Sequence, residues 1–325
     1  MDCKHLMRDA MLLLMAAFIV PVATHAQTYP AKSVRLISPY PPGSSADVIG
    51  RLYGTKLNEI FGRQFIVDNR AGAAGNIAGE IVAHAAPDGY TLLLLNTPLA
   101  SSQSLYKDLS FDVGRDFQSI AMLGFAPHLL VVNVSSPVKS VQELIALAKA
   151  RPGKLTYAST GTGGTLHLAM ELFKMQTGIN MLHVPYKGST YTVPDLIGGQ
   201  VDTMFGSVPA LLPHVRSGRI RALGVTSAQR SAVTPDLPTI AESGLPGFES
   251  STWITLAGPA RTPRNIVMVL NAAIAKSVQS PQFSTALANQ STEPMLMTPE
   301  QTAAFIRDEI VKWKKVVIAA GIKGE

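Results

Sequence analysis

The chain of 325 residues contains 46% hydrophobic and 15% charged residues, a composition typical of a globular protein rather than a disordered one. Its length favours two domains. The net charge of +6 arises from scattered lysines and arginines, and only 6% of the residues are aromatic, which argues against a nucleic-acid-binding protein.

The N-terminus has the pattern of a secretory signal peptide. Residues 11–20 are apolar, basic residues precede them, and small residues near Ala26 suit cleavage. We expect a signal peptide over residues 1–26, cleaved after about Ala26, and a mature protein exported to the periplasm. The alternative is an uncleaved anchor, although a bilayer span needs about 20 apolar residues. Cys3, the only cysteine, lies in this segment, so the mature chain offers no disulfide and no thiolate ligand.

Downstream of Ala31, strand patterns alternate with helix patterns. The expected strands cover residues 34–38, 65–67, 91–95, 129–134, 155–159, 181–184, 203–205, 222–226 and 253–257. The expected helices cover residues 46–61, 76–86, 141–150, 165–177 and 193–197, and two more begin at Thr262-Pro263 and Thr298-Pro299. This alternation predicts an α/β fold with mostly parallel sheets.

Two of the strand-to-helix junctions are rich in glycine and hydroxyl side chains. Their sequences are Ser38-Pro39-Tyr40-Pro41-Pro42-Gly43-Ser44-Ser45-Ala46-Asp47 and Ser159-Thr160-Gly161-Thr162-Gly163-Gly164-Thr165. The first N–H groups of a helix lack partners within it, so such junctions can bind an anion without a buried cation. We interpret the two loops as facing each other across a cleft and holding a carboxylate.

Each of these segments also has a purely structural interpretation. Ser44-x-x-Asp47 fits a helix-capping box, and a capping residue can contact a ligand as well. Gly161 and Gly163 fit positive backbone φ angles as well as a binding loop. Asn96 and Thr97 follow a buried strand, where they form either a helix cap or a pocket wall.

No set of catalytic residues is evident in the sequence. It lacks a G-x-S-x-G nucleophile elbow, an H-E-x-x-H zinc motif and a G-x-x-x-x-G-K-[ST] phosphate loop, and its nearest dinucleotide-binding pattern is incomplete. His167 and Glu171 share a helical face, but one such pair is more often an ordinary i,i+4 contact than a metal site. We therefore expect no catalytic residue, no metal and no cofactor.

Several short motifs in a fixed order resemble a known family. They are Tyr29-Pro30, Pro41-Pro42-Gly43, Asn69-Arg70-Ala71-Gly72, Pro87-Asp88-Gly89-Tyr90-Thr91, Pro152-Gly153-Lys154-Leu155, Ser159…Gly161…Gly163…His167, His183-Val184-Pro185-Tyr186-Lys187-Gly188, Pro238-Thr239, Ala241-Glu242 and Trp313. Together they span essentially all of the mature chain. They resemble the Bug/TctC family, the extracytoplasmic substrate-binding receptors of tripartite tricarboxylate transporters.

The resemblance implies a type II periplasmic-binding-protein (Venus-flytrap) fold, in which two crossing segments join two α/β lobes. On that basis lobe 1 comprises residues 27–130 plus 253–325, and lobe 2 comprises residues 131–252. The implied ligand is a small carboxylate, such as a di- or tricarboxylate, an acidic amino acid or an aromatic acid. The implied partner is a membrane permease of the tripartite type, and we expect a monomer.

The resemblance also implies which residues contact the ligand. They are Tyr40, Gly43, Ser44, Ser45 and Asp47 on the first loop, Ser159, Gly161, Thr162 and Gly163 on the second, and Tyr186, Lys187 and Gly188 near the rim. The strand-end pattern adds Asn96 and Thr97. Ser44 departs from the family, which usually has a second glycine there. Its side chain either adds a ligand contact or narrows the pocket.

Two other functions remain open from the sequence. A receptor of this kind could hand its ligand to a sensor protein in a signalling system, which the residues do not distinguish from uptake. An exported α/β enzyme would have to use His167 or Asp47 as a base, and the missing nucleophile and metal set argue against it.

Overall fold

The computed structural model describes residues 29–231 and 233–323, except the side chain of Ser45. The expected signal peptide over residues 1–26 and its cleavage site therefore lie outside the described residues. The chain divides into two units, Met1–Ala31 and Lys32–Glu325, and the fold given below is that of the second unit. Within the described residues, no helix is both long and apolar enough to cross a membrane.

The first group of strands is parallel. β1 (Val34–Ser38) pairs with β2 (Phe65–Asn69) on one side and with β3 (Thr91–Asn96) on the other. α2 (Ser45–Phe61) connects β1 to β2, and α3 (Asn76–Ala83) connects β2 to β3. The four leucines of β3 are all buried, as expected for a strand that is covered on both faces.

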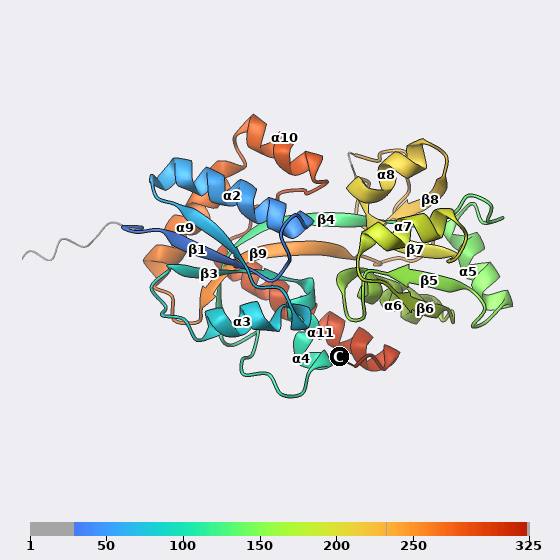
Figure 1. Cartoon of the computed structure of the whole chain (residues 1–325), viewed down its shortest axis with the longest axis horizontal. Coiled ribbons are helices and arrows are strands. Elements are labelled where there is room, and N and C mark those ends of the chain that lie inside the picture. The colour runs from blue at the N-terminus through green and yellow to red at the C-terminus, as the bar shows by residue number, and fades with distance from the viewer. Residues whose placement is uncertain (1–28, 232, 324–325) are drawn as a thin grey trace, which may run out of the picture. The chain divides into compact units, whose positions relative to one another are not determined.

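Two long antiparallel strands connect this group to the rest of the sheet. β4 (Phe117–Asn133) pairs through residues 117–127 with β9 (Ser251–Pro259), and β9 pairs in turn with β3. From residue 128 onward β4 pairs instead with β7 (Thr203–Ser207) and β8 (Ile220–Val225). Figure 1 shows β4 and β9 running side by side between the two groups of strands.

The second group of strands is parallel again. β5 (Thr156–Ser159) lies between β7 and β6 (Leu182–Pro185) and pairs in parallel with both. The strand order is β2-β1-β3-β9-β4-β7-β5-β6, with β8 beside β4. α6 (Thr165–Thr177) connects β5 to β6, and α7 (Ser189–Ile197) connects β6 to β7. Ligands of α/β proteins bind beyond the carboxyl ends of parallel strands, which are where β1 and β5 lead into their loops.

The remaining helices begin and end where the local chemistry dictates. They are α4 (Thr97–Leu105), α5 (Val141–Ala150), α8 (Val208–Arg216), α9 (Arg264–Ser277), α10 (Pro281–Asn289) and α11 (Pro299–Ala320), and a short 3-10 helix, η2 (Ala73–Gly75), precedes α3. The hydroxyl of Ser140 caps α5, and Thr298 forms a capping box with Gln301 at the start of α11.

Helix α11 contributes to two hydrophobic clusters. Its residue Ile306 belongs to the cluster that contains Leu93 and Trp253 of the first strand group. Farther along, Trp313 and Val317 belong to the cluster that also contains the buried face of α6. One continuous helix therefore stabilises the packing around both strand groups.

The structure corrects several expected elements. The sheet is mixed rather than mostly parallel, because all pairings of β4 and β9 are antiparallel. β4 begins at residue 117, well before the expected start at residue 129. α9 begins at Arg264 after Pro263, and the hydroxyl of Thr262 donates to the Pro259 carbonyl instead of capping that helix.

The expected helices omit α4, α8 and α10, although a helix cap at Asn96 was one of two alternatives, and Asn96 does cap α4. Most of α4 is buried, including its serines Ser101 and Ser102, so its sequence lacks the alternation of polar and apolar faces that identifies a surface helix. Prolines lie at the starts of α4, α8 and α10, where a missing N–H costs nothing.

Candidate functional site

A pocket of about 700 Å³ lies where the loops after β1, β2 and β5 meet strands β4 and β9. Small-molecule sites typically occupy roughly 300–1,000 Å³. The lining residues are Pro39, Tyr40, Pro41, Ser44, Ala46, 71–75, Asn96, Pro98, Tyr106, His128, 160–166, Tyr186, Lys187, Ser207 and Thr252. Among these described residues none is Asp or Glu, and Lys187 is the only lysine or arginine.

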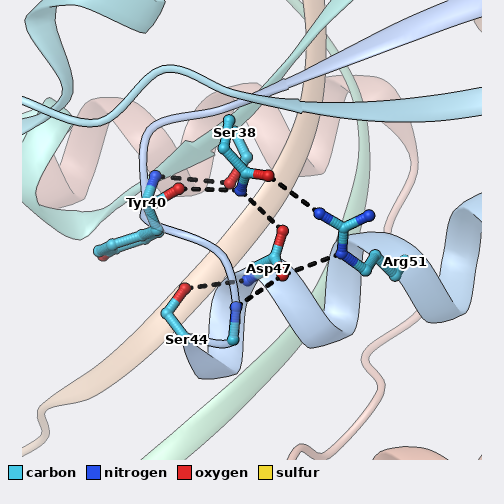
Figure 2. Close-up of polar contacts among 7 residues, drawn as sticks. Ser38, Tyr40, Ser44, Asp47 and Arg51 are labelled. Atoms are coloured by element: carbon cyan, nitrogen blue, oxygen red, sulfur yellow. Dashed lines mark hydrogen bonds and ion pairs between the residues drawn. The ribbon is translucent and has the colours of Figure 1, made fainter.

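The loop after β1 is held together by the carboxylate of Asp47, as Figure 2 shows. Oδ2 of Asp47 accepts hydrogen bonds from the Gly43 N–H and from Nε of Arg51, both at 2.9 Å. Oδ1 accepts from Nδ2 of Asn69 at 2.7 Å, and the same amide nitrogen lies 2.9 Å from the Tyr40 carbonyl oxygen. A carboxylate of the protein itself thus occupies the N-terminus of α2.

These contacts keep Asp47 ionised. Desolvation by burial raises the pKa of Asp47, but hydrogen bonds from Arg51, Asn69 and the Gly43 N–H together outweigh burial and hold that pKa below its usual value. A carboxyl group with a lowered pKa stabilises the folded state above its unfolded pKa, and the contribution is lost as the pH falls through the folded pKa. The hydroxyl of Ser44 completes the cap by accepting from the Asp47 N–H at 3.3 Å.

We expect the Asp47→Ala variant to have a free energy of unfolding about 3 kcal/mol lower than wild type at pH 7, because three partly buried hydrogen bonds to a buried carboxylate are lost. Denaturant unfolding measures this difference. It should shrink below about pH 4, where the carboxyl group of the unfolded chain protonates first, and disappear once the pH has fallen through the lowered pKa of folded Asp47. Asp108, which is exposed, provides the control, and Asp108→Ala should stay within about 0.5 kcal/mol of wild type. Equal stability of the two variants would contradict the role of Asp47.

The loop after β5 leaves the N-terminus of α6 open. The N-cap residue Gly164 offers no side-chain acceptor, and Thr165 and Leu166 of the first turn line the pocket. Gly161 and Gly163 have φ angles of +135° and +74°, which side-chain-bearing residues rarely adopt. The unsatisfied N–H groups of this turn can therefore donate to an anion in the pocket.

The side chains of Ser159, His167 and His183 support the backbone of this second loop. Oγ of Ser159 accepts from the Gly161 N–H at 3.2 Å and lies 2.6 Å from Nε2 of His183. The His183 ring stacks on His167 with centroids 3.9 Å apart, and Nδ1 of His167 accepts from the Gly163 N–H at 3.0 Å. Burial is the main cause that lowers the pKa of His167 to about 3, so its ring is neutral and can accept this bond.

The N-cap residues of five helices line the pocket. They belong to α2, α3, α4, α6 and α8 and are Ser44, Gly75, Asn96, Gly164 and Ser207. The side chains of Ser44 and Asn96 cap their own helices, whereas the other three make no side-chain cap. An uncapped N-terminus carries unpaired N–H groups and a partial positive charge, although at α3 the Asn76 N–H already bonds to the Ala73 carbonyl. The pocket is therefore suited to an anion.

Two tyrosines lie at the pocket, and each forms a hydrogen bond with the side chain of a residue on a helix, Tyr40 with one on α6 and Tyr186 with one on α7. Burial raises the pKa of Tyr40 to about 12, and a hydrogen bond with the side chain of Thr165 partly opposes that rise. The hydroxyl of Tyr186 donates to Asp195 Oδ2 at 2.7 Å. Tyr40 therefore connects the loop after β1 with the first turn of α6.

The structure brings eight of the expected contact residues to the pocket. They are Tyr40, Ser44, Asn96, Gly161, Thr162, Gly163, Tyr186 and Lys187. Five others do not line it, namely Gly43, Asp47, Thr97, Ser159 and Gly188. Gly43, Asp47 and Ser159 instead shape the two loops, Thr97 bonds to the backbone of β9, and Gly188 is the N-cap residue of α7. The side chain of Ser45 lies outside the described part of the chain.

Several lining residues were not expected. The glycine-rich turn over residues 71–75 lines the pocket, although its segment Asn69-Arg70-Ala71-Gly72 was noted above only as a family motif. His128 and Thr252 also line it and lie within long strands. Ser207 ends β7, which was expected to stop at residue 205, and Tyr106 follows α4. A single polar residue inside a strand has no local pattern that separates a pocket wall from a buried core position.

The arrangement supports binding better than chemistry. Ser159 and His183 have the spacing of a nucleophile and a base, but Ser159 is fully buried and does not line the pocket. Over the residues that the structure describes, no three His, Cys, Asp or Glu side chains are grouped as metal ligands.

Comparison with known proteins places the chain among solute receptors. The family model described as "Tripartite tricarboxylate transporter family receptor" (TctC) matches residues 49–322. Protein BugT of Bordetella pertussis (strain Tohama I) is 41% identical over 310 residues, which cover 95% of this chain and 94% of BugT.

Two similar solved structures contain carboxylates. An R. palustris protein solved with adipate is 38% identical, with a TM-score of 0.79, and the match covers 91% of this chain and 99% of that one. MatC from Rhodopseudomonas palustris, with bound malate, is 29% identical, with a TM-score of 0.76 and coverage of 89% and 100%. The fold of this chain is thus the mixed α/β fold of periplasmic solute-binding proteins.

Proposed function

The chain belongs to the tripartite tricarboxylate transporter receptor (TctC) family of substrate-binding receptors, and we propose that it captures a small carboxylate in the pocket and delivers it to a membrane permease. Family members bind a substrate rather than convert it. The adipate and malate of the two similar structures are both dicarboxylates, which supports the same ligand class here.

The observation that carries this proposal is the convergence of helix N-termini on a pocket without acidic side chains. A carboxylate at the start of α6 would accept several N–H bonds, each contributing about 1.5–3 kcal/mol. After the costs of association, three such bonds are compatible with micromolar affinity, about −8 kcal/mol. Lys187 at the rim adds attraction, and no buried arginine is needed.

We propose that lobe 1 comprises residues 27–130 plus 253–325, that lobe 2 comprises residues 131–252, and that the lobes close over the ligand by a hinge motion. In support, β4 changes its partner strand at His128 and β9 begins at Ser251, each close to a proposed boundary. α11 packs against α6, so on this proposal its last turns would link lobe 1 to lobe 2.

The cellular role completes the proposal. Residues 1–26 would direct export and be removed after about Ala26, leaving a monomeric receptor in the periplasm. Transfer of the ligand to a sensor protein is the alternative to transfer to a permease. Measuring uptake of the bound acid by cells that lack the receptor distinguishes the two roles. Loss of uptake supports delivery to a permease, and normal uptake supports transfer to a sensor.

A thermal-shift screen of the mature protein against organic acids tests the ligand class. At about 100 times its Kd, the correct acid should add about 2.7 kcal/mol to the free energy of unfolding. The melting temperature should then rise by several degrees. Sodium chloride at the same ionic strength is the control. If neutral sugars raise the melting temperature and no carboxylate does, the proposed ligand class is wrong.

A further inference from the structure

One side chain in the pocket has an unused hydrogen-bonding atom. His128 is 1% exposed and lines the pocket together with Thr252 and Ser207. Its Nε2 lies 3.0 Å from Oγ1 of Thr252. Its Nδ1 is buried, and none of the described residues forms a hydrogen bond with it. Buried polar atoms nearly always have a partner, so a partner from outside the chain is expected for Nδ1.

The chemistry of this imidazole defines what such a partner can be. Burial lowers the pKa of His128 to about 3, so the ring is neutral and carries one N–H and one acceptor nitrogen. The Thr252 hydroxyl can donate to Nε2, which places the ring proton on Nδ1 and directs it at an oxygen acceptor. The pair can therefore bind an oxygen atom without placing a fixed charge in the pocket.

The sheet places His128 well away from the open turn of α6. His128 is paired with Ser207 of β7, and β7 is followed in the sheet by β5, which leads into the glycine-rich loop. Two strand spacings, about 10 Å, thus separate His128 from β5. A short aliphatic diacid spans a separation of this size, so its second carboxylate can reach His128 while its first lies at the start of α6.

We infer that Nδ1 of His128, supported by Thr252, binds an oxygen of a second carboxylate on the ligand and so makes the pocket select dicarboxylates over monocarboxylates with an apolar end. The inference rests on the proposed function, because the first carboxylate is assigned to the N-terminus of α6. His128 is thus a specificity-determining residue. An apolar end would leave the buried Nδ1 without a partner, which is what disfavours it.

Calorimetric titration with adipate, hexanoate and the ω-amino acid of the same length tests this inference. Wild type should bind adipate at least about tenfold more tightly than hexanoate, the effect of one hydrogen bond to a charged group. Equal affinities would overturn the inference and leave the proposed function intact. Preference for the ω-amino acid would also overturn it, because Nδ1 would then act as an acceptor. Failure of every carboxylate to bind would overturn the proposed function and this inference together.

Variants of His128 and Thr252 test whether this pair causes the preference for adipate over hexanoate. His128→Phe keeps a planar ring without nitrogen and should lose about tenfold or more in adipate affinity, whereas hexanoate affinity should rise, because the variant has no Nδ1 to be left without a partner. Thr252→Val should weaken adipate binding in the same direction. Thr255→Val is the matched control, because Oγ1 of Thr255 is also buried without a described partner but does not line the pocket. Unchanged adipate affinity in a folded His128→Phe protein, or in Thr252→Val if the former does not fold, would overturn the inference.

Discussion

The Gly163→Val variant is expected to bind its carboxylate at least about 100-fold more weakly than wild type, the loss of two or more charge-assisted hydrogen bonds. Gly163 has a φ of +74° and donates its N–H to Nδ1 of His167. A Cβ at this position would lie 3.0 Å from Cδ1 of Leu105 in α4. A β-branched residue is strained at this positive φ and also presses on the Leu105 side chain, so we expect the loop and the first turn of α6 to shift.

The other end of the same helix offers a matched control. Gly178 ends α6 with a φ of +68°, and a Cβ there would meet nothing within 4 Å. Gly178→Val therefore introduces a similar backbone strain but does not touch the pocket. Calorimetry should show near wild-type affinity for Gly178→Val. If both variants, each confirmed as folded by circular dichroism, bind equally well, the loop after β5 does not hold the ligand.

The Glu309→Ala variant is expected to lower the free energy of unfolding by about 4 kcal/mol, since two buried donors lose their acceptor. Oε2 of Glu309 accepts hydrogen bonds from Nε1 of Trp253 at 2.6 Å and from Nε1 of Trp313 at 2.7 Å. Both indoles are fully buried, so water cannot replace the carboxylate without opening the core. Urea unfolding, followed by tryptophan fluorescence, measures the change.

Two further variants separate this role from a general effect of charge on α11. Glu309→Gln keeps an oxygen acceptor and should cost clearly less than Glu309→Ala. Glu300, at the start of the same helix, forms an exposed ion pair with Arg264, so Glu300→Ala should cost no more than about 1 kcal/mol. A loss for Glu309→Ala no larger than for Glu300→Ala would show that the carboxylate does not hold the two indoles.

Helices and strands whose residues show a clear local pattern could be predicted from the sequence. α2, α5 and α6 follow from apolar periodicity and their end residues, and the alternation of strands and helices gives the fold class. The antiparallel crossing of β4 and β9 could not be predicted in the same way. Residues 117–133 pair with segments about 70 to 140 residues later in the chain, and no local pattern specifies such pairing.

The candidate site, like the fold, could be predicted from the sequence only in part. The sequence indicates which loops offer N–H groups, but it does not show which acceptors of the chain reach them. At the first loop the carboxylate of Asp47 accepts the Gly43 N–H and is itself held by a bond from the side-chain amide of Asn69, whereas none of the described carboxylates caps the second loop. The two loops therefore differ in the structure, although they looked equivalent in the sequence.

The most direct test of carboxylate capture compares an acid with its neutral isostere. The best ligand of the thermal-shift screen and its amide, in which each carboxylate is replaced by a carboxamide, are titrated into the mature protein by calorimetry. We predict binding of the acid and at least about 100-fold weaker binding of the amide, because its uncharged oxygens make weaker bonds to the N–H groups of α6. Equal affinity for the acid and the amide would contradict the carboxylate-binding function.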